Sequence, residues 1–350
     1  MKTIDKSKPV MITGATGYVA GRIVEKLLME GLTIHAPVRN PDNQEKLHYL
    51  NAIAEKSDGT IKYFKADLLT EGSYEEAMEG CELVFHTASP FVTNVKNAEK
   101  DLVAPALIGT KNVLNSVNKV ESVKRVVLTS SCVAIIGDAK DLLPLPNQTA
   151  DENVWNKTSS VKHQPYNYSK TVAELAAWEL NKGQDRWDLV VINPSFVLGP
   201  GINPTSTSES FNIMKQIGDG TLKMGAPGLH IGIVDVRDLA IAHYNAGFTP
   251  EAEGRHIISN ESLTLLEMVD LLRDKYGANY PFPKKELPKW LVWLIGPFQG
   301  IPRKMVSLNF GYKWLVDNTK SKEKLGMHYR DSKDTLNDFF GQLVEAGIFK

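Results

Sequence analysis

The sequence predicts an α/β protein in which a doubly wound parallel sheet carries helices on both faces and is joined to a smaller, mainly helical C-terminal lobe. Two observations predict this class. Short apolar runs alternate with helical patterns between residues 10 and 192, and a glycine turn joins the first run to the first helical pattern. Because parallel strands are connected by crossover helices, this alternation is typical of βαβ units.

The apolar runs give the expected strands, and the periodic segments give the helices between them. Strands are expected at residues 10–13, 32–38, 61–64, 83–86, 126–129 and 189–192. Helices are expected from about 19 to the glycine at 31, near 41–52, 73–79 and 98–118, and from 166 to about 181. Apolar residues recur at helical spacing in the first of these segments, and glycine commonly ends such a helix.

The pattern changes after Pro194. Residues 198–210 predict a loop, 231–234 predict a strand that returns to the sheet, and the chain from about 261 reads as helices separated by Pro and Gly. A further helix is expected from about Arg237. We therefore expect two units. The sheet domain comprises 1–197 and 229–258, and the second lobe comprises 198–228 and 259–350.

The segment 287–301 is the most apolar stretch of the second half of the chain. Prolines and a glycine interrupt it, so it is too short to span a bilayer. A buried or substrate-covering helix is the preferred interpretation, and a subunit interface or a membrane-surface contact is the alternative. Trp290, Trp293 and Phe298 are expected to line a substrate pocket or to belong to the core of the lobe.

Composition excludes several classes of protein. The 350 residues are 42% hydrophobic and 23% charged, which is ordinary globular composition. Forty Lys and Arg against 41 Asp and Glu give a net charge of −1, which argues against a nucleic-acid binder. Two cysteines are too few for a disulfide framework, and no signal peptide or membrane span is evident, so a cytoplasmic protein is expected. The eight histidines show no metal-binding spacing, and no metal is expected.

The residues Gly14-Ala-Thr-Gly17-Tyr-Val-Ala20 follow the first expected strand and begin the first helix. Glycine at 14 and 17 lets the backbone turn sharply and approach a pyrophosphate, and the small Ala20 lets the helix pack on the strand. The free N–H groups at the helix N-terminus then favour phosphate. In this context the motif predicts a dinucleotide site.

Residues at the ends of the following strands indicate which dinucleotide is bound. Enzymes that prefer NAD usually carry an acidic residue at the end of the second strand. This chain has Arg39 there and Lys46 in the next helix, which suits the 2′-phosphate of NADP(H). Asp67 could accept from the adenine amino group, and the small residues after His86 could let the backbone pass beside the cofactor.

A tyrosine and a lysine four residues apart provide the expected chemistry. Tyr166 and Lys170 share one face of a helix, and Thr129-Ser-Ser131 ends the fifth expected strand. Ligands in such sheets bind outside the carboxyl ends of the strands. A neighbouring ammonium favours the phenolate and makes a tyrosine a usable acid and base for carbonyl reduction. A serine hydroxyl can polarise the carbonyl oxygen.

These motifs together resemble the extended short-chain dehydrogenase/reductases, a family with a Rossmann sheet. The resemblance is strongest to the branch with dihydroflavonol 4-reductase, cinnamoyl-CoA reductase and the yeast methylglyoxal/isovaleraldehyde reductases. The segments that carry it are 13–17 (TGATG), 84–90 (VFHTASP), 109–113 (GTKNV), 125–131 (RVVLTSS), 166–170 (YNYSK), 193–194 (NP), 234–240 (VDVRDLA) and 317–326 (DNTKSKEKLG).

The resemblance implies the roles of individual residues. Ser131, rather than Ser130, would form a catalytic triad with Tyr166 and Lys170. It also implies a monomer or a homodimer formed through the helices near 98–118 and 166–181. The residues expected to contact NADP(H) are Gly14, Thr16, Gly17, Tyr18, Val19, Arg39, Lys46, Asp67, Leu68, Thr87, Ala88, Ser89, Thr129, Tyr166, Lys170, Pro194 and Val197.

The preferred interpretation is an NADP(H)-dependent reductase of aldehyde or ketone carbonyls, with a small-molecule substrate in the second lobe. A sugar-nucleotide epimerase or dehydratase is an alternative, although dehydratases commonly carry an Asp-Glu pair where this chain has Cys132-Val133. A hydroxysteroid dehydrogenase stays open. A non-catalytic NADP(H) sensor is the last alternative, although sensors usually lose the Tyr or the Lys.

Overall fold

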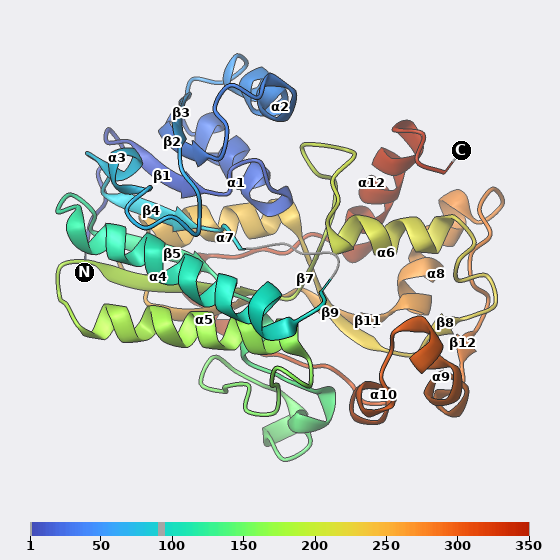
Figure 1. Ribbon diagram of the computed structural model, residues 1–350. Helices are drawn as coiled ribbons and strands as arrows, with labels where there is room; N and C mark the ends of the chain where they lie inside the picture. Colours follow the sequence, from blue (N-terminus) through green and yellow to red (C-terminus); the bar gives the residue numbers. More distant parts are fainter. Residues whose placement is uncertain (1, 90–94, 350) are drawn as a thin grey trace.

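A computed structural model describes residues 2–89 and 95–349 and confirms the predicted α/β class (Figure 1). Pro90, which ends one of the family motifs, lies outside the described residues. Seven parallel strands form the central sheet in the order β10-β6-β5-β4-β1-β2-β3. They are β1 (Val10–Thr13), β2 (Thr33–Val38), β3 (Thr60–Lys65), β4 (Leu83–His86), β5 (Arg125–Thr129), β6 (Asp188–Pro194) and β10 (Gly254–Ile258).

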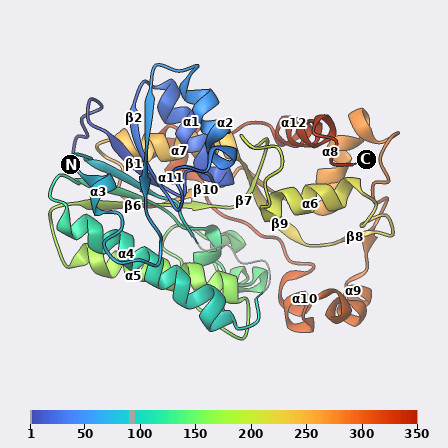
Figure 2. The same cartoon turned by 45° about the horizontal axis from the view of Figure 1, so that its top comes forward.

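Helices cover both faces of this sheet, as a doubly wound fold requires (Figure 2). They are α1 (Tyr18–Met29), α2 (Gln44–Ala54), α3 (Glu75–Met78), α4 (Ala104–Lys119), α5 (Pro165–Lys182) and α7 (Val236–Phe248). Successive residues of β1 point to opposite faces. Ile12 packs in the cluster formed with α1, α2 and α7, whereas Met11 packs in the cluster formed with α3, α4 and α5.

The second lobe combines two small sheets with helices. Its three-stranded sheet has the order β11-β9-β7, and a two-stranded sheet pairs β12 with β8. The strands are β7 (Phe196–Leu198), β8 (Ala226–Pro227), β9 (His230–Asp235), β11 (Glu261–Thr264) and β12 (Glu286–Leu287). The helices are α6 (Glu209–Gly218), α8 (Leu265–Tyr276), α9 (Lys289–Ile295), α10 (Arg303–Asn309) and α12 (Ser332–Glu345). One further helix from this part of the chain, α11 (Thr319–Leu325), packs instead against α7 and β10 of the central sheet.

One strand was predicted correctly from the sequence but was assigned to the wrong sheet. The strand predicted at 231–234 exists as β9, but it pairs with β7 and β11 and does not return to the central sheet. The strand that returns is β10, which pairs with β6 and was not predicted. Polar Arg255 and His256 interrupt the apolar pattern of β10. Both are buried there, and Arg255 is neutralised by an ion pair with Glu174.

The apolar segment 287–301 is not a buried helix, so this half of the preferred interpretation, a buried or substrate-covering helix, is wrong. It folds into α9 and a following 3₁₀ turn (Gly296–Gln299), and only Val292 of α9 is buried. Trp290 is 67% exposed and Phe298 is 87% exposed, because the helix packs through one narrow stripe. No helix in the described part of the chain is long and apolar enough to cross a membrane.

Candidate active site

The glycine turn lies at the carboxyl end of β1 and is closed against the end of β4. Gly14 has φ of +71°, a conformation that L side chains rarely adopt. Its carbonyl accepts the Gly17 N–H at 2.8 Å. A Cβ placed on Gly14 would lie 3.1 Å from the Cα of Ala88. The missing side chain at Gly14 therefore lets the turn pack against Ala88. Thr16 and Gly17, which follow it, are exposed at the N-terminus of α1, and this cradle fits the close approach of a dinucleotide.

A threonine that the sequence analysis did not single out holds the two strand ends together. The buried Thr13 hydroxyl accepts the N–H groups of Thr87 at 3.1 Å and Ala88 at 3.0 Å. It lies 3.0 Å from Nδ1 of His86, to which it donates its proton. Burial, with a smaller contribution from the Lys170 ammonium, lowers the pKa of His86 to about 3, so the imidazole is neutral. This network fixes the backbone of Thr87 and Ala88 beside the glycine turn.

Replacing Gly14 with alanine is expected to weaken dinucleotide binding at least about tenfold as well as to destabilise the fold. The left-handed conformation alone costs about 1–2 kcal/mol for an L side chain. The matched control is Gly80→Ala, because Gly80 has φ of +75° but nothing lies within 4 Å of the position that a Cβ would take. Fluorescence titration with NADPH and urea unfolding separate the two effects. Equal NADPH affinity in both variants would contradict the proposed cradle.

Arg39 and Lys46 lie where the sequence predicts, at the end of β2 and in the first turn of α2. Both side chains are exposed. Asn43 caps α2, and its side-chain oxygen accepts the Lys46 N–H at 3.1 Å. The two cations and the helix N-terminus form a surface that favours a phosphate.

Asp67 and Leu68 follow β3 and are held by α4. The Asp67 carboxylate accepts the Leu69 N–H at 2.9 Å, which leaves further acceptor capacity free. Asn112 donates to the Leu68 carbonyl at 3.1 Å. A Cβ on Gly109 would lie 2.6 Å from the Leu68 side chain. The Gly109 and Asn112 positions of the family motif therefore serve to seat the loop after β3.

Several expected cofactor residues have side chains that are already engaged. The Tyr18 hydroxyl donates to the Gly199 carbonyl at 2.6 Å, and its ring packs on aromatic residues of the second lobe. The Thr129 hydroxyl donates to His243 Nε2 at 2.7 Å, because Nδ1 of that histidine donates to a helix carbonyl. Val197 lies in β7, and buried Pro194 ends β6. The hydroxyl protons of Tyr18 and Thr129 are thus already donated to protein acceptors.

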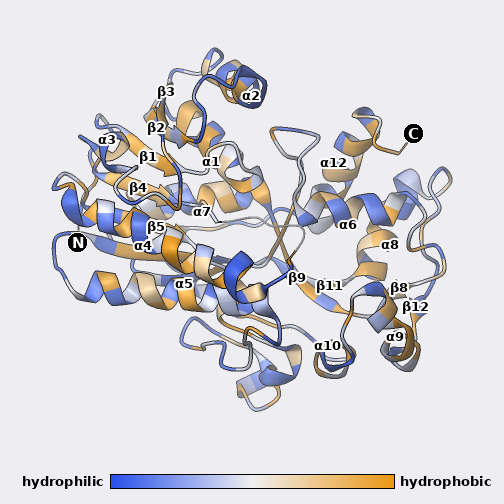
Figure 3. Cartoon of the chain, viewed as in Figure 1, coloured by the Kyte–Doolittle hydropathy of each residue, from blue (hydrophilic) through white to orange (hydrophobic). Residues whose placement is uncertain are grey.

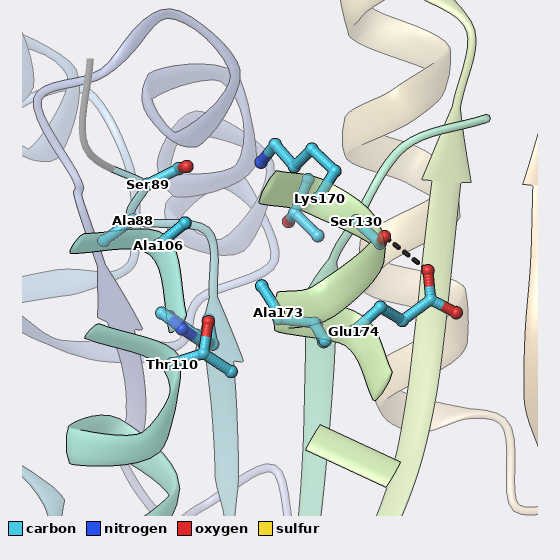
Figure 4. Close-up of a pocket in the computed structure, with 11 residues that line it drawn as sticks. Ala88, Ser89, Ala106, Thr110, Ser130, Lys170, Ala173 and Glu174 are labelled. Carbon is cyan, nitrogen blue, oxygen red and sulfur yellow. Dashed lines mark hydrogen bonds between the residues drawn. The ribbon is translucent and has the colours of Figure 1, made fainter. Parts of the chain in front are cut away.

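Three further expected cofactor residues lie in the glycine turn, at the start of α1 and just after β4. Thr16 is exposed, Val19 is half-buried in the first turn of α1, and Ser89 is exposed after β4. Ser89 and Ala88 also line the small cavity shown in Figure 4.

Helix α5 places Tyr166 and Lys170 on one face. Pro165 occupies its first position, and Gln164 before it adopts a left-handed conformation with φ of +54°. Tyr166 is 51% exposed, and the Lys170 ammonium lies 6.0 Å from the centroid of its ring. The phenol is therefore accessible and has a cation close by.

A buried carboxylate holds the start of α5 and was not predicted from the sequence. Asp138 Oδ2 lies 2.7 Å from His163 Nε2, and its Oδ1 accepts from Gln164 at 3.2 Å. The Asn309 side chain of α10 donates to the same Oδ1 at 2.7 Å. Asp138 thus connects the second lobe to the two residues that lead into the helix of Tyr166.

The two serines after β5 have different environments. Ser130 is buried, and its hydroxyl donates to Glu174 at 2.5 Å (Figure 4). Ser131 is half-buried. Its hydroxyl accepts the Val133 N–H at 3.3 Å and donates to the Pro194 carbonyl at 3.4 Å. The long second bond leaves the Ser131 proton available for another acceptor, whereas the Ser130 proton is committed.

Glu174 is the third residue that the sequence analysis missed, after Thr13 and Asp138. It is 1% exposed and lies one helical turn beyond Lys170. Its carboxylate pairs with Arg255 at 2.7 Å and accepts from Asn193 at 2.9 Å. The same Asn193 amide donates to the Ser131 carbonyl at 3.1 Å. The spacing Tyr166, Lys170, Glu174 on one helix face is the signal that could have found it.

A small cavity lies between α4, α5 and the ends of β4 and β5 (Figure 4). Its volume is about 20 Å³, which is room for about one water molecule. Lys170, Glu174, Ser130 and His86 line it. His86 Nε2 has no hydrogen-bond partner among the described residues. In the described ranges, no three His, Cys, Asp or Glu side chains gather as a metal ion would require.

The family of the chain follows from its similarity to known proteins. Residues 10–257 match the family described as the NAD dependent epimerase/dehydratase family. The chain therefore belongs to this family, and the resemblance to the extended short-chain dehydrogenase/reductases is confirmed.

Particular relatives are reductases that align over most of the chain. The chain is 34% identical over 349 residues to tetraketide alpha-pyrone reductase 1 of Arabidopsis thaliana, covering 98% of each protein. It is 37% identical over 302 residues to cinnamoyl-CoA reductase CAD2 of Medicago truncatula, covering 83% of this chain and 85% of the relative. The structure of yeast methylglyoxal/isovaleraldehyde reductase Gre2 complexed with NADPH superposes with a TM-score of 0.77 at 28% identity, covering 98% of this chain and 100% of that chain. These relatives support an oxidoreductase.

Proposed function

We propose that this protein is an NADP(H)-dependent reductase that converts the carbonyl of an aldehyde or ketone to an alcohol. The observation that carries the proposal is the accessible Tyr166 phenol with the Lys170 ammonium beside it, on α5, which packs against α4 and β6. The reductase relatives, and the NADPH bound to the yeast enzyme, support it.

The roles of the chain's own groups follow from their chemistry. Tyr166 holds the proton that the carbonyl oxygen receives, and Lys170 stabilises the phenolate that is left. The Ser131 hydroxyl turns from its long bond to Pro194 and donates to the carbonyl oxygen. A nicotinamide dinucleotide bound at the glycine turn supplies the hydride. Asp138 and Glu174 act only by positioning the helix and the serine loop.

The proposal is tested with the purified protein by following NADPH oxidation with a panel of carbonyl compounds. The panel runs from aliphatic and aromatic aldehydes to diketones, dihydroflavonols, CoA thioesters and steroid ketones. Turnover of at least one aldehyde or ketone, with the alcohol product identified, is expected, whereas turnover of the CoA thioesters alone would contradict the proposal. Conversion of a sugar nucleotide without net NADPH consumption would instead assign the chain to the epimerases of its family.

The exposed side chains of Arg39 and Lys46 predict that the protein prefers NADPH to NADH. The double variant Arg39→Ala/Lys46→Ala is expected to lower kcat/KM for NADPH by about 10–100-fold, because hydrogen bonds to charged groups contribute about 1.5–3 kcal/mol. The kcat/KM for NADH should change little. Lys56→Ala, an exposed lysine beyond the other end of α2, is the matched control. An unchanged ratio of the NADPH and NADH values would show that these cations do not contact the 2′-phosphate.

A further inference from the structure

The segment that contains α9 exposes an unusual number of large apolar side chains. We call Trp290, Trp293, Leu294, Ile295 and Phe298 the aromatic ridge. All five are at least 40% exposed, and Phe298 reaches 87%. Figures 1 and 2 place α9 and α10 side by side at the edge of the second lobe, away from the central sheet. Figure 3 shows the hydrophobic residues of this segment on that edge.

The ridge is held in place without its exposed side chains. Val292 packs with Val306 and Phe310 in a small separate cluster. The Ile301 N–H donates to the Gly296 carbonyl at 2.9 Å, and Lys289 donates to the Phe310 carbonyl at 2.5 Å. The exposed side chains therefore add little to the stability of the lobe, and their apolar surface needs another explanation.

The segment of the chain that carries the ridge is strongly basic, although the whole chain has a net charge of −1. Residues 284–304 contain five Lys or Arg side chains and a single carboxylate. The Arg303 guanidinium lies 4.5 Å from the centroid of the Trp293 ring, and Lys284, Lys285 and Lys304 are exposed. Tryptophan and phenylalanine beside lysine and arginine are the side chains that bind at the interface of an anionic bilayer.

We propose that the aromatic ridge docks the protein on the surface of an anionic lipid bilayer, with the aromatic rings at the headgroup level and no segment crossing. The positive charge around the aromatic ridge favours an anionic bilayer over a second copy of the chain. A twofold contact between two ridges would bring the same cations face to face, whereas an anionic surface neutralises them.

The test is co-sedimentation of the full chain with vesicles of phosphatidylcholine, with and without phosphatidylserine, at low and high salt. We expect binding that needs phosphatidylserine and weakens with salt. The double variant Trp290→Ser/Phe298→Ser should reduce partitioning at least about tenfold. Leu175→Ser on α5, where leucine is 45% exposed, is the matched control and should bind as the wild type does.

Three outcomes would overturn the proposal. The first is no sedimentation of the wild type with phosphatidylserine vesicles, and the second is equal sedimentation of the ridge variant. The third is a wild-type dimer in light scattering that the ridge variant converts to a monomer, because the ridge would then be a contact between copies. Urea unfolding of the variant verifies its fold, and the ridge residues lie outside the proposed catalytic machinery, so the proposed reductase activity is tested separately.

Discussion

Replacing Tyr166 with phenylalanine is expected to lower kcat for carbonyl reduction by about 10²–10⁴-fold, the usual contribution of a positioned acid. The ring stays in place and only the hydroxyl is lost, so the fold and the glycine turn are unaffected. NADPH affinity, measured by fluorescence titration, should therefore stay within about threefold of the wild type. Steady-state oxidation of NADPH with a substrate found in the carbonyl panel gives the change in kcat.

Tyr168→Phe is the control for this variant, because Tyr168 lies two residues further along α5 and so does not share the face of Lys170. It should retain nearly full kcat. If the Tyr168 variant were the inactive one, or if both variants were active, Tyr166 would not be the proton donor. Loss of NADPH binding in the Tyr166 variant would place the tyrosine in cofactor binding rather than in proton transfer.

Replacing Glu174 with alanine is expected to cost about 3–5 kcal/mol of unfolding free energy. Its carboxylate neutralises Arg255, which is itself 6% exposed and stacks 3.9 Å from the centroid of the Trp155 ring. Without the carboxylate, a buried guanidinium loses its counter-charge, and Ser130 and Asn193 lose their acceptor. Urea unfolding measures the loss directly.

Glu179→Ala tests whether this cost comes from the buried ion pair, because Glu179 lies on the same helix but is exposed. Its substitution should change stability by less than about 0.5 kcal/mol. Glu174→Gln keeps the shape and two of the hydrogen bonds. Its unfolding free energy should lie between those of the two alanine variants. Equal urea midpoints for Glu174→Ala and Glu179→Ala would mean that the ion pair does not stabilise the fold.

Most of the central sheet was predictable because its strands read as short apolar runs. The β4 strand was placed at its observed bounds, since all four residues are buried and the flanking residues are polar. β10 was missed because polar residues interrupt its apolar run. Its Arg255 is buried only because Glu174, far away in the sequence, supplies the counter-charge. Pairing between distant residues of this kind leaves no periodic signal.

The same limit applies to the candidate site. Tyr166 and Lys170 could be found because four residues separate them on one helix. Asp138 could not, because its role depends on contacts with His163 and with Asn309 of the other lobe. The exposure of Trp290 was also missed, since an apolar run in a sequence does not show whether another element covers it.

Hydride transfer from the dinucleotide to a carbonyl carbon is tested with NADPH that carries deuterium at the transferable C4 position and a ketone or aldehyde found in the carbonyl panel. We predict one deuterium on the carbon that carried the carbonyl oxygen, one equivalent of NADP⁺ for each product molecule, and loss of both in Tyr166→Phe. Deuterium that remains on the dinucleotide while substrate is converted would contradict the proposed reduction.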